Sequence, residues 1–245
     1  MLKPLRLLAA LVLALHLVAC ASLDASRYGA PVSVRILAIN DFHGNLHPPG
    51  GGIRIRNPGD PQDAGKTVMV PAGGAEHLAS AVKELRRGHE NQVFVAAGDL
   101  IGASPLLSAV FHDEPTIEAL ILMGLEISAV GNHEFDAGVD ELLRKQNGGC
   151  HPVQGCKGTA PFKGANFRYL AASTWDTRTQ RTIFPAYRVK RFDGISVAFI
   201  GLTLKGTPDI VTPSGVAGLR FDDEADTVNR LVPELRAQGI EAIVV

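Results

Sequence analysis

Aromatic residues and net charge are what this sequence has least of. Its 245 residues include one tryptophan and three tyrosines, and 24 basic residues nearly balance 25 acidic ones, for a formal charge of −1. Such a chain shows neither the basic surface nor the aromatic stacking pattern typical of nucleic-acid binding. Its apolar content of 46% fits an ordinary globular protein. Any attraction for anions must therefore come from a local site, and bound divalent metal ions would supply one.

Long hydrophobic runs are also missing. The apolar run at 7–18 has about 12 residues, fewer than the ~20 that a helix needs to span a bilayer. Lys3 and Arg6 precede this run, and Cys20 follows it closely. The segment 1–19 resembles a bacterial lipoprotein signal, in which the cysteine after the cleavage site carries the lipid. An ordinary secretory signal cleaved nearby is the alternative, and it would make Cys20 incidental.

The lipoprotein interpretation predicts where the protein is found. Residues 20–31 are then a tether, and 32–245 belong to the folded domain. Ala21 follows the cysteine, and in the bacterial lipoprotein pattern the absence of Asp at that position indicates outer-membrane sorting. We therefore expect an extracytoplasmic, lipid-anchored protein at the outer membrane, facing the periplasm or the cell surface.

Only two cysteines remain in the predicted domain. Cys150 and Cys156 have five residues between them in a turn-rich segment. Outside the cytoplasm, a pair this close predicts a local disulfide. The alternative is a metal site formed by His151 with both thiolates.

Apolar runs rich in β-formers alternate with amphipathic segments along the predicted domain, which indicates the α/β class. Strands are expected at 32–39, 92–97, 127–130 and 240–245, and helices after Gly73-Gly74 and at 114–125, 138–146 and 224–238. The dipeptide Asp193-Gly194 predicts a hairpin between 188–191 and 196–201, so a mixed sheet is expected. The Pro- and Gly-rich stretch 47–66 is expected to be an exposed loop.

Polar clusters follow three of these strands. They are Asp41-Phe42-His43, Gly98-Asp99 and Gly131-Asn132-His133-Glu134-Phe135-Asp136. Open α/β sheets collect functional groups at the carboxyl ends of their strands. Asp99 and Asn132 are 33 residues apart, which fits one strand–helix–strand unit. The three clusters are therefore expected to lie side by side.

The residue types in these clusters favour metal binding. Asp41 and His43 are two apart, so in an extended segment both side chains point the same way. Asp99 could bridge two ions with its two oxygens, and Asn132 offers an amide oxygen. Mixed oxygen and nitrogen ligands suit divalent ions of the Zn, Mn, Co or Fe type. Two such ions ~3.5–4 Å apart hold a bridging hydroxide and neutralise phosphate charge during in-line attack. Each cluster alone is common in turns and helix caps, and the prediction depends on finding all three in one chain.

Together the three clusters resemble the calcineurin-like metallophosphoesterases, and within them the bacterial 5′-nucleotidase and UDP-sugar hydrolase branch. The resemblance runs from about Val34 to the end of the sequence, and Leu204-Lys205-Gly206-Thr207-Pro208 and Pro213-Ser214-Gly215-Val216 extend it. It implies a four-layer α-β-β-α sandwich with mixed sheets. It also implies metal-dependent hydrolysis of phosphoesters, with nucleotides favoured as substrates.

The resemblance assigns a role to each position. Asp41 and His43 would bind the first metal ion, Asp99 would bridge two ions, and Asn132 would bind the second. His133 would stabilise the transition state or protonate the leaving oxygen, and Asp136 would orient His133. From the residues alone, Glu134 is expected to be either a helix-entry residue or a residue that supports the site without binding metal. The remaining histidines are expected at the surface: His47, His77, His89 and His112.

The family has further metal-binding histidines, one after the strand that begins near Ile240 and others in a later Gly-His-x-His pattern. The printed sequence reaches Val245 before any of them. We therefore expect 32–245 to be the N-terminal part of the domain, incomplete at the C-terminus. Three alternatives stay open: a non-catalytic metal-binding lipoprotein or fragment, a cyclic-nucleotide phosphodiesterase, and a thiosulfate-ester hydrolase on the same scaffold.

Overall fold

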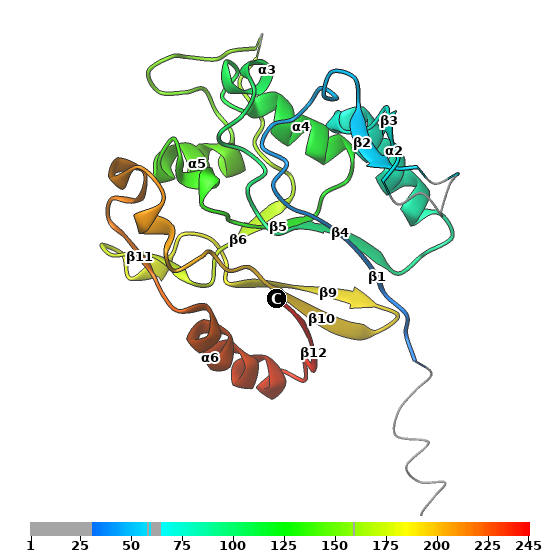
Figure 1. Ribbon diagram of the computed structural model, residues 1–245. Coiled ribbons are helices and arrows are strands. Elements are labelled where there is room, and N and C mark those ends of the chain that lie inside the picture. Colours follow the sequence, from blue (N-terminus) through cyan, green and yellow to red (C-terminus); the bar gives the residue numbers. More distant parts are fainter. Residues whose placement is uncertain (1–30, 58, 60–64, 159) are drawn as a thin grey trace, which may run out of the picture. The chain divides into compact units, whose positions relative to one another are not determined.

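A four-stranded sheet positions the three polar clusters in the computed structural model, which describes residues 31–57, 59, 65–158 and 160–245 (Figure 1). The signal expected at 1–19, Cys20 and nearly all of the expected tether lie outside the described residues. Residues Val34–Val245 form one unit. Within the described part, no helix is long and apolar enough to cross a membrane.

The first sheet has the order β1-β4-β5-β6. All the described pairings in it are parallel, and the strands are β1 (Arg35–Ile39), β4 (Gln92–Ala96), β5 (Ile127–Ala129) and β6 (Arg168–Leu170). A parallel sheet is covered on both faces, which explains why β4 is an almost continuous apolar run. Because the strands are parallel, the carboxyl ends of β1, β4 and β5 meet at one edge.

Four helices cover one face of this sheet (Figure 1). They are α2 (Gly74–Arg86), α3 (Leu106–Ala109), α4 (Glu114–Leu122) and α5 (Val139–Asn147). The largest buried cluster joins α2, α4 and α5 to the sheet and contains Phe94, Ile117, Leu120, Leu142 and Tyr169. This core fixes where each strand ends, and so where each polar cluster begins.

The second sheet faces the other side of the first (Figure 1). Its order is β12 (Ala242–Val244), β10 (Ile195–Ile200), β9 (Tyr187–Phe192), with β10 parallel to β12 and antiparallel to β9. The predicted hairpin is confirmed, and its turn residues Asp193 and Gly194 both have positive φ. Helix α6 (Glu224–Ala237) packs Leu231 and Leu235 against this sheet. Helices, sheet, sheet and helix give the expected four layers.

The smaller elements lie outside the two main sheets. A third sheet has the order β11 (Leu219–Phe221), β7 (Thr174–Asp176), β8 (Arg181–Thr182). Three short 3-10 helices are η1 (His133–Phe135), η2 (Thr207–Asp209) and η3 (Pro213–Val216).

The expectation of one exposed loop at 47–66 is wrong in part. Its residues Ile53–Arg56 form β2, which pairs antiparallel with β3 (Thr67–Val70). The alternation Ile-Arg-Ile-Arg is a strand pattern, but it spans only four residues between Pro- and Gly-rich flanks. Gly52 belongs to this hairpin, because a Cβ there would lie 2.1 Å from the carbonyl oxygen of Val70.

A buried ionic network ties α5 to α4. Glu141 accepts hydrogen bonds from the Arg144 guanidinium, both at 2.7 Å, and contacts the Lys145 ammonium. Arg144 also donates to Glu114 at 2.7 Å. Burial acts to raise the pKa of Glu141, but hydrogen bonds from Arg144 and Lys145 outweigh it and lower that pKa to about 2.

Glu141 therefore stabilises the fold in a pH-dependent way. Its folded pKa lies below the ordinary value of 4.5, so its contribution is complete above pH 4.5 and is lost as the pH falls towards 2. Between pH 4.5 and pH 2, we expect the free energy of unfolding to fall by about 2–3 kcal/mol less in Glu141→Gln than in wild type. Urea unfolding at a series of pH values measures this, with the exposed Glu118→Gln on α4 as the control. Parallel pH curves for Glu141→Gln and wild type would contradict the assignment.

Candidate metal centre

The loops that follow β1 and β4 run side by side, joined by backbone hydrogen bonds. Asp41 N donates to Gly98 O at 3.2 Å, His43 N to Asp99 O at 3.0 Å, and Gly44 N to Leu100 O at 3.0 Å. These bonds continue the β1–β4 pairing past the ends of the strands. The structure therefore brings together the first two polar clusters, as the sequence predicted.

The β4 and β5 loops touch backbone to backbone. A Cβ on Gly98 would lie 2.4 Å from Gly131 N, and one on Gly131 would lie 2.2 Å from Asp99 Oδ1. Real Cβ atoms essentially never approach this closely, so both positions need glycine. The two glycines allow the third cluster to reach the other two.

Three of the predicted ligands have unusual backbone conformations. Asp41, His43 and Asp99 have φ values of 51°, 46° and 52°. The left-handed region is uncommon for residues other than glycine, and strained residues cluster at functional sites. The hydrogen bonds between the loops hold the chain in this conformation.

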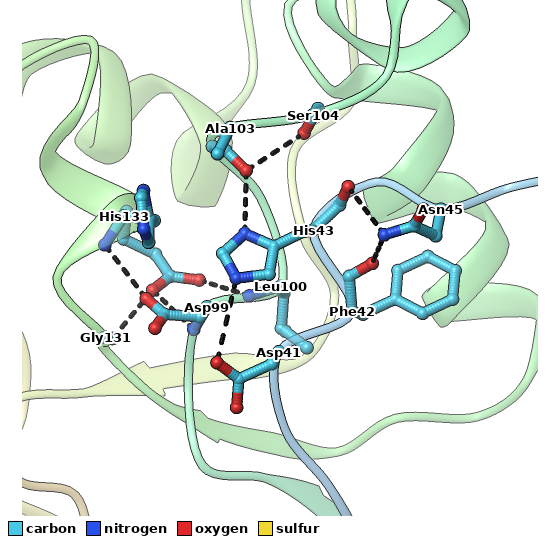
Figure 2. Close-up of polar contacts among 12 residues, drawn as sticks. Asp41, Phe42, His43, Asn45, Asp99, Leu100, Ala103, Ser104, Gly131 and His133 are labelled. Atoms are coloured by element: carbon cyan, nitrogen blue, oxygen red, sulfur yellow. Dashed lines mark hydrogen bonds and ion pairs between the residues drawn. The ribbon is translucent and has the colours of Figure 1, made fainter.

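Asp41, His43 and Asp99 form a group that could hold a metal ion (Figure 2). One donor atom from each lies within 4.8 Å of the others, and no other group of three or more acidic, histidine or cysteine residues does so among the described residues. His43 Nδ1 lies 2.9 Å from Gly102 O and therefore carries a proton that it donates. His43 Nε2 is then left with its lone pair, and it lies 3.7 Å from Asp41 Oδ1. Orienting a histidine ligand through its other nitrogen is typical of metal sites.

Asn132 lies between two residues that contact the Asp99 carboxylate. Gly131 packs against that carboxylate, and His133 N donates to Asp99 Oδ1 at 2.9 Å. Asp99 Oδ2 is left for another partner. The donor set of two carboxylates and an imidazole fits divalent metal ions of the borderline class.

His133 and Asp136 form a hydrogen-bonded pair beside the three ligands. His133 Nδ1 lies 2.9 Å from Asp136 Oδ2, which also accepts from Ala103 N at 3.1 Å. The rings of His43 and His133 meet edge to face, with centroids 4.8 Å apart. Burial acts to lower the pKa of His133, but the hydrogen bond and charge of Asp136, with the charges of Asp99 and Glu134, raise it above its ordinary value.

Glu134 has a more specific place than its motif indicated. It is 2% exposed, and its carboxylate accepts from three backbone amides: Asp99 N at 2.9 Å, Leu100 N at 2.8 Å and Gly131 N at 2.7 Å. Burial raises the pKa of Glu134 to about 7, although these hydrogen bonds lower it. Nothing in the sequence separates this residue from an acid at a helix entry, because all three donors are backbone groups.

The remaining predicted residues lie in the 150–156 loop. The structure pairs Cys150 with Cys156 in a disulfide, with Cα atoms 4.4 Å apart. His151 Nδ1 accepts from Val153 N and Gln154 N, so that nitrogen is engaged within the loop. His112 is half-buried: its ring stacks on His151 with centroids 4.5 Å apart, and its Nε2 atom is buried.

Comparison with known proteins agrees with this geometry. The family model described as calcineurin-like phosphoesterase matches residues 34–244. The chain is 37% identical over 219 residues to "Endonuclease YhcR" of Bacillus subtilis, covering 87% of this chain and 17% of that protein. It is 34% identical over 227 residues to "Cell wall protein Lmo0130" of Listeria monocytogenes, covering 87% and 27%.

Two further similarities concern nucleotide-related proteins. The chain is 30% identical over 243 residues to "Probable 5'-nucleotidase" of Treponema pallidum, covering 98% of this chain and 36% of that protein. Among solved structures, the NAD nucleotidase of Haemophilus influenzae superposes with a TM-score of 0.66 at 25% identity, covering 86% of this chain and 33% of that one. The chain thus spans about a sixth to a third of these proteins.

The close approach at Gly131 gives a direct test of the metal centre. In Gly131→Ala the new Cβ would collide with Asp99 Oδ1 and N, so the carboxylate must move. We expect Mn²⁺ to bind at least about tenfold more weakly, a loss of about 1.4 kcal/mol. Isothermal titration of Mn²⁺ into the protein measures the affinity.

Gly206→Ala is the matched control. Its φ is −76°, and its Cβ would meet only Leu204 side-chain atoms at 4.0 Å. We expect wild-type Mn²⁺ affinity for this variant. Equal affinities for the two alanine variants would show that Asp99 does not bind the ion.

Proposed function

Because the chain belongs to the calcineurin-like phosphoesterase family, we propose that it is a metal-dependent hydrolase that cleaves phosphate esters of nucleotides. The observation that carries this proposal is the group Asp41, His43 and Asp99, with the His133–Asp136 pair beside it. Neither the group of three residues nor the histidine–aspartate pair would be enough alone. The group of three can hold metal cations, and the pair supplies a proton donor held in one orientation.

The likeness to the family assigns the metal ligands. Asp41 and His43 would hold one divalent ion, Asp99 would contact both ions, and Asn132 would hold the second. Such ions supply positive charge that stabilises a phosphoryl group and lower the pKa of bound water. Zn, Mn, Co and Fe fit the mixture of oxygen and nitrogen donors.

His133 is assigned to the leaving group. Its Nδ1 is engaged by Asp136, so Nε2 is the nitrogen that is free to exchange a proton with the substrate. A proton on Nε2 can be donated to the leaving oxygen or can hydrogen-bond a phosphoryl oxygen. Asp136 fixes the ring and supports its positive charge.

Nucleotide monoesters are the favoured substrates because of the likeness to a protein named as a 5′-nucleotidase over 98% of this chain. A second candidate is hydrolysis of phosphodiesters. The higher identity to a protein named as an endonuclease, 37% against 30%, favours it. Another relative, 27% identical, is named as a 2′,3′-cyclic-nucleotide 2′-phosphodiesterase and 3′-nucleotidase. Its name combines a phosphodiesterase with a phosphomonoesterase activity.

Hydrolysis can be tested with AMP, UDP-glucose, a 2′,3′-cyclic nucleotide and single-stranded DNA, each with Mn²⁺, Zn²⁺ or Co²⁺. We expect product from at least one substrate. Asp99→Ala and His133→Ala should each lower kcat/KM by at least about 100-fold, because they remove a metal ligand and the proton donor.

His89→Ala is the control for loss of a histidine. His89 precedes β4 and so lies at the opposite end of that strand from Asp99. We expect unchanged kcat/KM for it. Turnover that survives both Asp99→Ala and His133→Ala would refute the assigned roles, and the substrate that is cleaved separates monoesterase from diesterase.

We also propose that the protein is an extracytoplasmic lipoprotein, with a signal at 1–19, a tether at 20–31 and the catalytic domain from residue 32. The run before Cys20 supports this, as does the likeness to a protein named as a cell wall protein. The disulfide between Cys150 and Cys156 suits an oxidising compartment.

Lipidation is tested by expressing the chain in a Gram-negative host with labelled palmitate. We expect the wild type to carry the label in the membrane fraction and Cys20→Ser to lose it, since the lipid needs the thiol. Cys150→Ser is the matched control and should keep the label. Label that persists in Cys20→Ser would rule out Cys20 as the modified residue.

A further inference from the structure

The carboxylate of Glu134 lies where the loops after β4 and β5 meet. One oxygen, Oε2, accepts from Asp99 N and Gly131 N, and the other, Oε1, accepts from Leu100 N. These donors belong to two loops, one after β4 and one after β5. Glu134 therefore joins the loop that carries Asp99 to the loop that carries Asn132.

The constraint extends to the third loop. Gly98 O accepts from Asp41 N, and Asp99 O accepts from His43 N. Glu134 holds the Gly98–Asp99 and Asp99–Leu100 peptide groups through their N–H, and the same two peptide groups face the β1 loop with their C=O. A displacement of Asp99 or Leu100 would move the backbone that positions His43.

We propose that Glu134 is a positioning residue that sets the spacing between the metal ligands without binding an ion itself. Its two oxygens are occupied by backbone donors, and the side chain is buried. The inference rests on the proposed metal site, but it does not depend on which substrate is cleaved.

Glutamate suits this role because of the number of acceptors it offers. Three amide donors converge on two acceptor oxygens. A glutamine has the same shape but only one acceptor oxygen, and its NH₂ group would face at least one of these amides. A buried donor without an acceptor is costly, so the loops would move apart to restore hydrogen bonding to water.

Another buried carboxylate provides a comparison within the same fold. Glu114 is 9% exposed and pairs with the Arg144 guanidinium at 2.7 Å. Its carboxylate accepts a hydrogen bond from Arg144 of α5, not from a metal-binding loop. Glu114→Gln should therefore destabilise the fold and leave the metal site intact.

The test is a pair of Mn²⁺ titrations without substrate, accompanied by thermal unfolding. We expect Glu134→Gln to bind Mn²⁺ about tenfold or more weakly than wild type. Glu114→Gln should lower the unfolding temperature and keep wild-type affinity. Wild-type affinity in Glu134→Gln would overturn the proposal, and so would an equal loss of affinity in both variants.

Hydrogen exchange of the wild-type protein provides a measurement that needs no variant. In metal-free protein, the amides of Asp99, Leu100 and Gly131 should be protected, because they donate to Glu134 whether or not an ion is bound. Exchange as fast as in an exposed loop would overturn the proposal. If Glu134→Gln does not fold, the exchange rates of these three amides in the wild type test the proposal instead.

These outcomes separate the inference from the proposed function. Weak Mn²⁺ binding in Glu134→Gln together with no hydrolysis by the wild type would support the positioning role and reject the enzyme. Hydrolysis by the wild type together with full Mn²⁺ affinity in Glu134→Gln would support the enzyme and reject the positioning role.

Discussion

The backbone contact between the β4 and β5 loops is the constraint on which the site depends. Gly98 and Gly131 meet where neither could carry a Cβ. Without that approach Asn132 would lie farther from Asp99, and His133 N could not reach the Asp99 carboxylate. The parallel pairing of β1, β4 and β5 brings the loops to one edge, but the glycines decide how close they come. The order of the strands explains why the site lies at this edge of the sheet. The lack of side chains at the two glycines explains how close the loops come to each other.

The charges of the site differ from those of the rest of the interior. In the α5 network, the carboxylates of Glu114 and Glu141 are paired with Arg144 and Lys145, so the buried charges nearly cancel. At the candidate metal centre, Asp41 and Asp136 form ion pairs only with histidines among the described residues. Carboxylates gathered without lysine or arginine repel one another. Divalent ions would remove that repulsion, and for this reason the fold and the metal are expected to stabilise each other.

Much of this arrangement follows from the sequence, and the part that does not has a physical reason. The strand ends before Asp99 and Asn132 follow from apolar runs, because β4 and β5 are largely buried. The β2–β3 hairpin escaped detection because its four-residue strands lie among turn-forming residues. The role of Glu134 depends on three backbone amides, and backbone donors have no sequence signature. The stacking of His112 on His151 is likewise a contact across two loops.

The loops suit the proposed phosphoester chemistry, and we expect the choice of substrate to depend on other parts of the molecule. Proteins with different names, an endonuclease and a 5′-nucleotidase among them, resemble the same span of this chain. A site built from backbone bonds and two glycines has little freedom to vary, whereas the surfaces around it can change without disturbing the ligands. One such surface is α3, which begins two residues after Ser104 and exposes Leu106 and Leu107. Specificity is therefore expected to reside in elements such as α3, and differences between relatives there should follow the substrate more closely than differences in the metal-binding loops.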